Sequence, residues 1–242
     1  MDSDMAGIVG GAIKSEIINS MSHREHQQKI RVWDLPTRLF HWLLAACIVA
    51  SLISVEIGGN AMVWHGRFGY VALTLILFRL AWGVVGPRYA RFAQFVKGPA
   101  AVLREIRGIA PRVPGHNPLG ALSVLAMLLL IGIQAGLGLF SSDDIAFDGP
   151  LAKHVSSAAV EFATRWHHRF EWLLIGVILL HLAAVVWHQR IKGHDLVRPM
   201  LNGDQWASSL AAPQSARDDA GMRARALVVI ALAALLVAYL SR

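Results

Sequence analysis

The sequence predicts an all-α integral membrane protein, built as a four-helix bundle followed by a fifth, C-terminal transmembrane helix. The 242 residues are 55% hydrophobic and only 16% charged, and the mean hydropathy is +0.47. Soluble domains carry about 25% charged residues, so the composition is that of a membrane protein. The single cysteine, Cys47, excludes an internal disulfide framework.

Five segments are apolar over a length that can cross a hydrocarbon core about 30 Å thick, which takes roughly 20 residues. They are residues 39–57, 63–85, 119–140, 170–187 and 224–240. The first four carry isolated polar residues, whereas the fifth carries none between Ala226 and Ala238. We therefore expect the first four to form the functional bundle and the fifth to be a lipid-facing anchor.

The basic residues predict the orientation of these spans. Most of the 23 lysines and arginines precede the first span or lie in the loops after the second and fourth spans. Flanking Lys and Arg stay in the cytoplasm, so the chain is expected to start there and to end on the opposite side. The net charge of +7 is thus a topology signal, and nucleic acid is not an expected partner.

These spans predict a division of the chain into four parts. They are a cytoplasmic tail (1–31), the four-helix bundle (32–203), a cytoplasmic linker (204–223) and the last helix (224–242). The apolar stretch 5–13 has no basic residues before it, so a cleaved signal peptide is not expected. No extramembrane part is long enough for a separate catalytic domain.

Four of the eleven histidines are candidate ligands: His41 near the start of the first span, His65 near the start of the second, and His167 and His181 on the helix of the fourth. His167 and His181 are fourteen residues apart, which places them on one helix face and about 21 Å apart along the axis. The topology puts His65 at the outer level of His167, and His41 near the inner level of His181. Two histidine pairs at two depths predict two haems with bis-histidine ligation. One cysteine cannot supply a Cys-x-x-Cys-His motif, so such haems are b-type and non-covalent.

Other readings of these histidines stay open. A membrane histidine is often only a hydrogen-bonding group between helices. A zinc site would need ligands that converge at one point, whereas these lie at two depths. His168 lies about 100° around the helix from its neighbour His167 and could replace it as a ligand, or it could contact a haem propionate.

Three further residues complete the candidate cofactor-binding set. Arg79, near the inner end of the second span, is a candidate partner for a propionate of the inner haem, with snorkelling to the cytoplasmic surface as the alternative. Arg67, beside His65, could serve an outer propionate or a lipid headgroup, and so could Arg169. His116 is the loop histidine for which a role in the site stays open. The full set is His41, His65, His167, His181, Arg67, Arg79, His168 and His116, and no catalytic residue is expected.

An ordered series of strings carries a family resemblance. VWDLPTRLFHW (32–42), WHGRFGY (64–70), FRLAWGVVGPRYARF (78–92) and GHNPLG (115–120) precede the helix with His167 and His181. From about residue 32 to about 203 the chain resembles the prokaryotic cytochrome b561 family, which includes the cytochrome b subunits of nickel-iron hydrogenases. The resemblance implies a four-helix di-haem core with His41 and His181, and His65 and His167, as axial ligands. The family has His-Glu where this chain has His167 and His168.

The resemblance also implies a function. It is electron transfer in the bacterial inner membrane between the quinone/quinol pool and a redox partner. The basic residues then predict a C-terminus in the periplasm. The strings at 32–34 and 40–41 look more like members that work with a periplasmic c-type cytochrome. The alternative is a membrane-anchor subunit that binds a peripheral subunit of a hydrogenase-like oxidoreductase. Any enzymatic activity would be quinol:acceptor oxidoreduction. A rival from another class is a haem-free proton or ion transporter that uses the same histidines.

Overall fold

The computed structural model describes residues 27–242, except 112, 144, 146 and 209–212. Five of its helices are long and apolar enough to cross a membrane, so the predicted all-α membrane fold and its five spans are confirmed. They are α2 (Leu35–Ile57), α3 (Met62–Val85), α6 (Pro118–Gly138), α7 (Ser157–Arg190) and α9 (Ala220–Leu240). Residues 1–26 of the expected tail lie outside the described residues.

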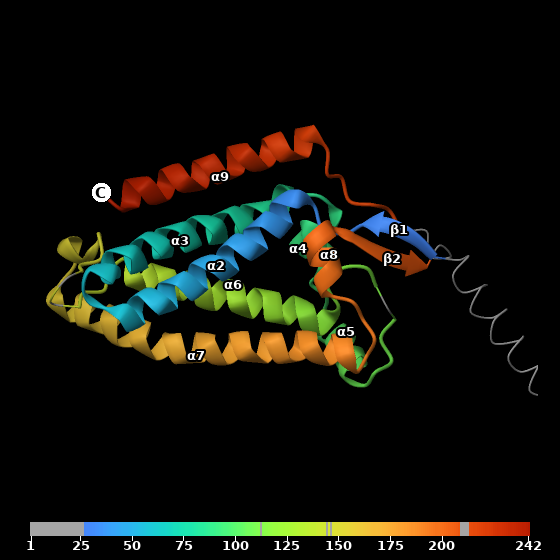
Figure 1. The fold of residues 1–242 in the computed structure, drawn as a ribbon, viewed down its shortest axis with the longest axis horizontal. Helices are drawn as coiled ribbons and strands as arrows, with labels where there is room; N and C mark the ends of the chain where they lie inside the picture. Colours follow the sequence, from blue (N-terminus) through green and yellow to red (C-terminus); the bar gives the residue numbers. More distant parts are fainter. Residues whose placement is uncertain (1–26, 112, 144, 146, 209–212) are drawn as a thin grey trace, which may run out of the picture.

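Shorter elements connect these helices. They are β1 (Gln27–Arg31), η1 (Gly59–Ala61), η2 (Arg88–Ala90), α4 (Phe92–Phe95), α5 (Pro99–Ile106), η3 (Ala152–His154), α8 (Val197–Asn202) and β2 (Asp204–Ser208). The strands pair at one end of the bundle, which we call the sheet end (Figure 1). The opposite end, which we call the loop end, holds the described residues between 139 and 156 and the C-terminus.

Local sequence explains where three of the long helices begin. The side chains of Asn117, Ser156 and Asp219 accept hydrogen bonds from backbone N–H groups in the first turns of α6, α7 and α9 (2.7, 3.3 and 2.9 Å). These residue types are favoured N-caps because they satisfy amide groups that have no partner inside the helix. Proline in the first turn of α2 and of α6 also favours initiation.

The bundle consists of two helix pairs. Helix α2 packs along α3, α6 packs along α7, and α3 also contacts α6 and α9. The buried core lies between α2, α3 and α6 and includes Phe40, Phe78 and Trp82. Helix α7 buries little of its surface and leaves Trp172, Leu180 and other large apolar side chains exposed, as a lipid-facing helix does.

Helix α9 lies outside the four-helix bundle, against α3 and on the far side of it from α7 (Figure 1). It is buried there through Met222, Ala226, Ala233 and Val237. Arg225 Nη1 donates to the Val85 carbonyl (3.3 Å), and Lys153 Nζ donates to the Arg242 carbonyl (3.0 Å). The last helix therefore runs from the sheet end to the loop end, as an odd number of spans requires.

The small sheet was not predicted. Strands β1 and β2 pair antiparallel with Arg31 opposite Asp204, and this pair also forms an ion pair (3.0 Å). The backbone N–H groups of Val32 and Trp33 both donate to the Gly203 carbonyl. Each strand has five residues, and its partner is far away in the sequence. No local pattern could therefore reveal that the end of the expected tail pairs with the start of the expected linker.

Candidate functional site

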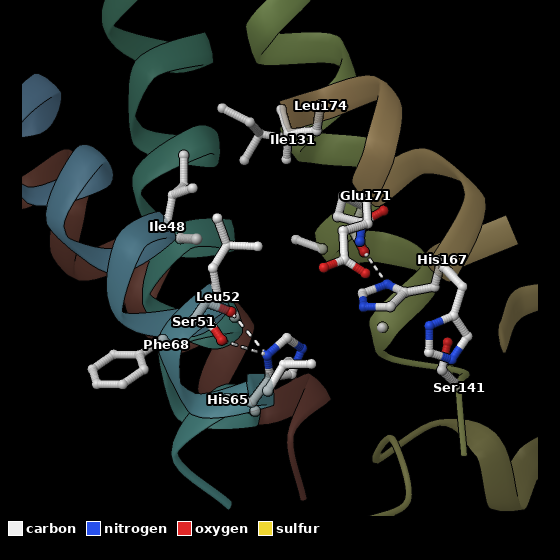
Figure 2. Close-up of a pocket in the computed structure, with 18 of the residues that line it drawn as sticks. Ile48, Ser51, Leu52, His65, Phe68, Ile131, Ser141, His167, Glu171 and Leu174 are labelled. Atoms are coloured by element: carbon white, nitrogen blue, oxygen red, sulfur yellow. Dashed lines mark hydrogen bonds between the residues drawn. The ribbon is translucent and has the colours of Figure 1, made fainter. Parts of the chain in front are cut away.

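A cavity opens between α2, α3, α6 and α7 near the loop end, with an empty volume of about 1230 Å³ that includes its mouth. Most of its lining is apolar, and Figure 2 shows Ile48, Leu52, Ile131 and Leu174 among the side chains around it. Apolar walls with a few convergent polar groups are typical of a site for a large organic ligand.

Two histidines face each other in this cavity. The rings of His65 on α3 and His167 on α7 have centroids 5.9 Å apart and planes at 85°. His65 Nδ1 lies 3.2 Å from the Ser51 carbonyl oxygen and 3.0 Å from Ser51 Oγ, and His167 Nδ1 donates to the Gln134 carbonyl (3.0 Å). A carbonyl can only accept, so both Nδ1 atoms carry the proton and both Nε2 atoms remain free to bind a metal.

This donor set fits a haem. Two imidazoles that bind one metal at about 2 Å per bond have ring centres about 6 Å apart, close to the observed separation. The apolar walls on either side suit the faces of a flat macrocycle. Among the described residues, no group of three or more His, Cys, Asp or Glu side chains converges as a bare metal site would need. The spacing argument that paired His65 with His167 therefore agrees with their placement.

A second cluster lies toward the sheet end. His41 on α2 and His181 on α7 are close enough to interact electrostatically, and His116 interacts with both and with Arg79. Three polar atoms here are buried without a hydrogen-bond partner among the described residues. They are His41 Nδ1, His116 Nδ1 and Arg79 Nη1. Buried polar groups are normally paired, so this cluster has the unmet hydrogen-bonding capacity of a binding site.

His116 is held by aromatic rings just before α6. Its ring centroid lies 4.6 Å from that of Trp33 and 4.7 Å from that of Phe95. Burial, followed by the positive charge of Arg79, lowers the pKa of His116 to about 3. The imidazole is therefore neutral at physiological pH and can donate or accept a hydrogen bond.

Arg79 is 2% exposed, and its guanidinium lies 4.8 Å over the Phe92 ring. No ion pair to it occurs among the residues that the structure describes. Arg79 follows His65 by fourteen residues, the spacing that separates His181 from His167. An arginine on α3 thus occupies the level at which α7 carries its second histidine.

Sequence reasoning missed a buried hydrogen-bond network beside this cluster. Trp82 Nε1 donates to Asp34 Oδ2 (2.8 Å), and Thr37 Oγ1 donates to Asp34 Oδ1 (2.5 Å). Asp34 is fully buried, and burial raises the pKa of its carboxyl group. The position of Asp34 before the apolar run could have identified a helix start, but nothing local pointed to Trp82.

The structure does not bring every candidate into a site. The guanidinium groups of Arg67 and Arg169 lie over the rings of Trp64 (4.7 Å) and Trp166 (5.3 Å), and neither arginine lines the cavity. His168 does line it, as does Glu171, which the sequence reasoning passed over. Ser51 and Gln134, which orient the facing histidines, were also missed as functional residues.

Comparison with known proteins supports the family resemblance. Residues 32–203 match the family model described as prokaryotic cytochrome b561. A probable Ni/Fe-hydrogenase B-type cytochrome subunit of Azotobacter chroococcum is 26% identical, covering 76% of this chain and 94% of the relative. A protein of the same description from Bradyrhizobium diazoefficiens is 24% identical, covering 73% of this chain and 85% of the relative. The probable Ni/Fe-hydrogenase 1 B-type cytochrome subunit of Escherichia coli is 22% identical, covering 71% of this chain and 88% of the relative. No solved structure matches significantly. The match to the family model covers most of the chain, and the chain therefore belongs to the prokaryotic cytochrome b561 family.

Proposed function

We propose that this protein carries electrons across the bacterial inner membrane through two b-type haems, one bound by His65 and His167 and the other by His41 and His181. Membership of a b-type cytochrome family implies haem b and electron transfer, and each haem supplies reversible one-electron chemistry at its iron. The observation that carries the proposal is the pair of facing imidazoles, each with Nδ1 held by a carbonyl and Nε2 free.

At the loop end, the surrounding residues orient the ligands and exclude water. The Ser51 and Gln134 carbonyls fix the tautomers and the ring positions of His65 and His167. Ile131 and Leu174, both buried, belong to the apolar wall. His168 lines the cavity beside His167 and is assigned to a propionate, with exchange for His167 as the alternative.

At the sheet end, we assign the propionates to the unpaired donors. Arg79 Nη1 and His116 Nδ1 are buried and lack partners, and a carboxylate would satisfy both. His41 Nδ1 also has no partner among the described residues, so binding of the haem would set which ring nitrogen of His41 carries the proton. Arg67, which lies over Trp64, is assigned to lipid headgroups rather than to a propionate.

The proposed partners are the quinone/quinol pool in the lipid and a redox protein at the loop end. Two kinds of redox protein fit, a periplasmic c-type cytochrome and a peripheral subunit of a hydrogenase-like oxidoreductase. The names of the relatives favour the second. The distribution of basic residues supports a cytoplasmic sheet end and a periplasmic C-terminus.

Transfer across a sealed membrane tests this function. The purified protein is placed in lipid vesicles that contain ferricyanide, and dithionite is added outside. We expect reduction of the trapped ferricyanide at a rate well above that of protein-free vesicles, and loss of that rate in His41→Ala and His181→Ala. A colourless protein that gives the protein-free rate would contradict the proposal and favour the haem-free transporter.

A further inference from the structure

The two proposed haem sites differ in the sign of the charge beside them. At the sheet end, the guanidinium of Arg79 is 2% exposed, has a buried unpartnered Nη1, and makes no ion pair among the described residues. Asp34 is the carboxylate that interacts with it electrostatically. The oxygens of Asp34 already accept hydrogen bonds from Trp82 and Thr37, and it forms no ion pair with Arg79. No carboxylate of the described residues therefore pairs with Arg79, and the proposed contact with a propionate lets its charge act directly on the sheet-end haem.

The loop end has a carboxylate in the corresponding place. Glu171 follows His167 by one helical turn on α7 and lines the cavity, and its carboxylate points into the cavity in Figure 2. In the described part of the chain it has no ion pair. The nearby arginines do not compensate it from inside the cavity, because Arg67 and Arg169 lie over the rings of Trp64 and Trp166.

Charges at these positions act on reduction in opposite directions. A positive charge stabilises the state with one more electron, and a negative charge destabilises it. The effect is strong where the surroundings are apolar and the effective dielectric constant is low. Burial and nearby charge are among the means by which a protein sets a haem potential.

We infer that Arg79 gives the sheet-end haem the higher reduction potential and that Glu171 gives the loop-end haem the lower one, so that electrons run downhill from the loop end to the sheet end. This inference rests on the proposed function and gives it a direction. A donor protein at the loop end would lose one electron and an acceptor at the sheet end would gain it, and the charges of Glu171 and Arg79 favour this direction. With quinone as the acceptor, two such electrons and two protons from water yield quinol.

Potentiometric titration of the purified protein in detergent tests this direction. His167→Ala should lose the loop-end haem and so assign the remaining potential to the sheet end. In the wild type, we expect an electron to favour the sheet-end haem over the loop-end haem by at least tenfold, which is about 59 mV for one electron. Glu171→Gln should raise only the lower potential, and Arg79→Gln should lower only the higher one.

Matched variants control for charge alone. Glu161→Gln removes a charge from an exposed site on α7, and Arg225→Gln removes one from an exposed site at the start of α9, so both should shift the potentials far less. Arg79→Gln could lose the sheet-end haem altogether. In that case Arg79→Lys, which keeps the charge, should keep the higher potential. The shift of the lower potential in Glu171→Gln then still tests the inference. A loop-end haem with the equal or higher potential would overturn the inference, as would no larger shift in Glu171→Gln than in Glu161→Gln. Failure of the proposed function itself would appear earlier, as fewer than two haems per wild-type chain.

Discussion

The indole N–H of Trp82 on α3 donates a 2.8 Å hydrogen bond to the carboxylate of Asp34, and both side chains are fully buried. Asp34 immediately precedes α2, so this bond joins the start of one helix to the end of its neighbour beside the sheet-end cluster. This hydrogen bond therefore fixes α2, which carries His41, relative to α3, which carries Arg79.

Replacement of Trp82 by phenylalanine should destabilise the protein. It leaves an oxygen of Asp34 buried without its donor, which costs about 1–3 kcal/mol. Thermal unfolding in detergent should show a lower Tm than the wild type. Trp206→Phe is the control because that side chain is 63% exposed, and it should unfold near the wild-type temperature. Equal Tm values for the two variants would show that the bond contributes nothing.

The packing of Phe147 at the loop end requires a glycine at position 66. A Cβ at Gly66 would lie 2.5 Å from the ring of Phe147, which packs there from the connection between α6 and α7. Gly66→Ala should therefore displace Phe147, open the cavity mouth and speed haem loss to an external haem-binding protein. A Cβ at Gly176 on α7 would meet nothing within 4 Å, and Gly176 does not line the cavity, so Gly176→Ala should lose haem at the wild-type rate. Equal haem loss from both variants would contradict this role of Phe147.

The hydroxyl group of Ser51 should support the ligand role of His65. Ser51→Ala removes one of two contacts to His65 Nδ1 and leaves the carbonyl contact in place. Loss of such a partner typically weakens metal binding by about 10–100-fold. Because the carbonyl contact remains, we expect haem affinity to fall by about tenfold in this variant. Haem titration of the apoprotein measures the change. Thr74→Ala, which removes a hydroxyl bonded within α3, should bind normally. An unchanged affinity in Ser51→Ala would leave orientation to the carbonyl alone.

Stability should fall as the pH drops from about 6.5 toward 3. Burial lowers the pKa of His116 from 6.5 to about 3, so in this range the unfolded chain binds a proton that the folded chain does not. One such proton corresponds to about 1.4 kcal/mol per pH unit. His116→Phe keeps an aromatic ring between Trp33 and Phe95 and removes the titration. Its unfolding free energy should depend less steeply on pH, and an equal slope would contradict the assignment.

The parts of the fold that could be predicted are those set by local pattern. Apolar length gave the five spans, and helical periodicity placed His167 and His181 on one face at two levels. The sheet could not be predicted, because β1 and β2 meet only through tertiary pairing. The same holds for the contact of Trp82 with Asp34 and of Phe147 with Gly66. Arg79 could have been placed more firmly, because its fourteen-residue spacing from His65 repeats that of the two α7 histidines.

Haem content tests the central claim most directly. Haem quantitation with a reduced-minus-oxidised spectrum should give two b-type haems per wild-type chain. His65→Ala and His167→Ala should each retain one haem with the same spectrum, while His168→Ala should retain two. Fewer than two haems per wild-type chain would contradict the account, and so would His65→Ala and His167→Ala losing different haems.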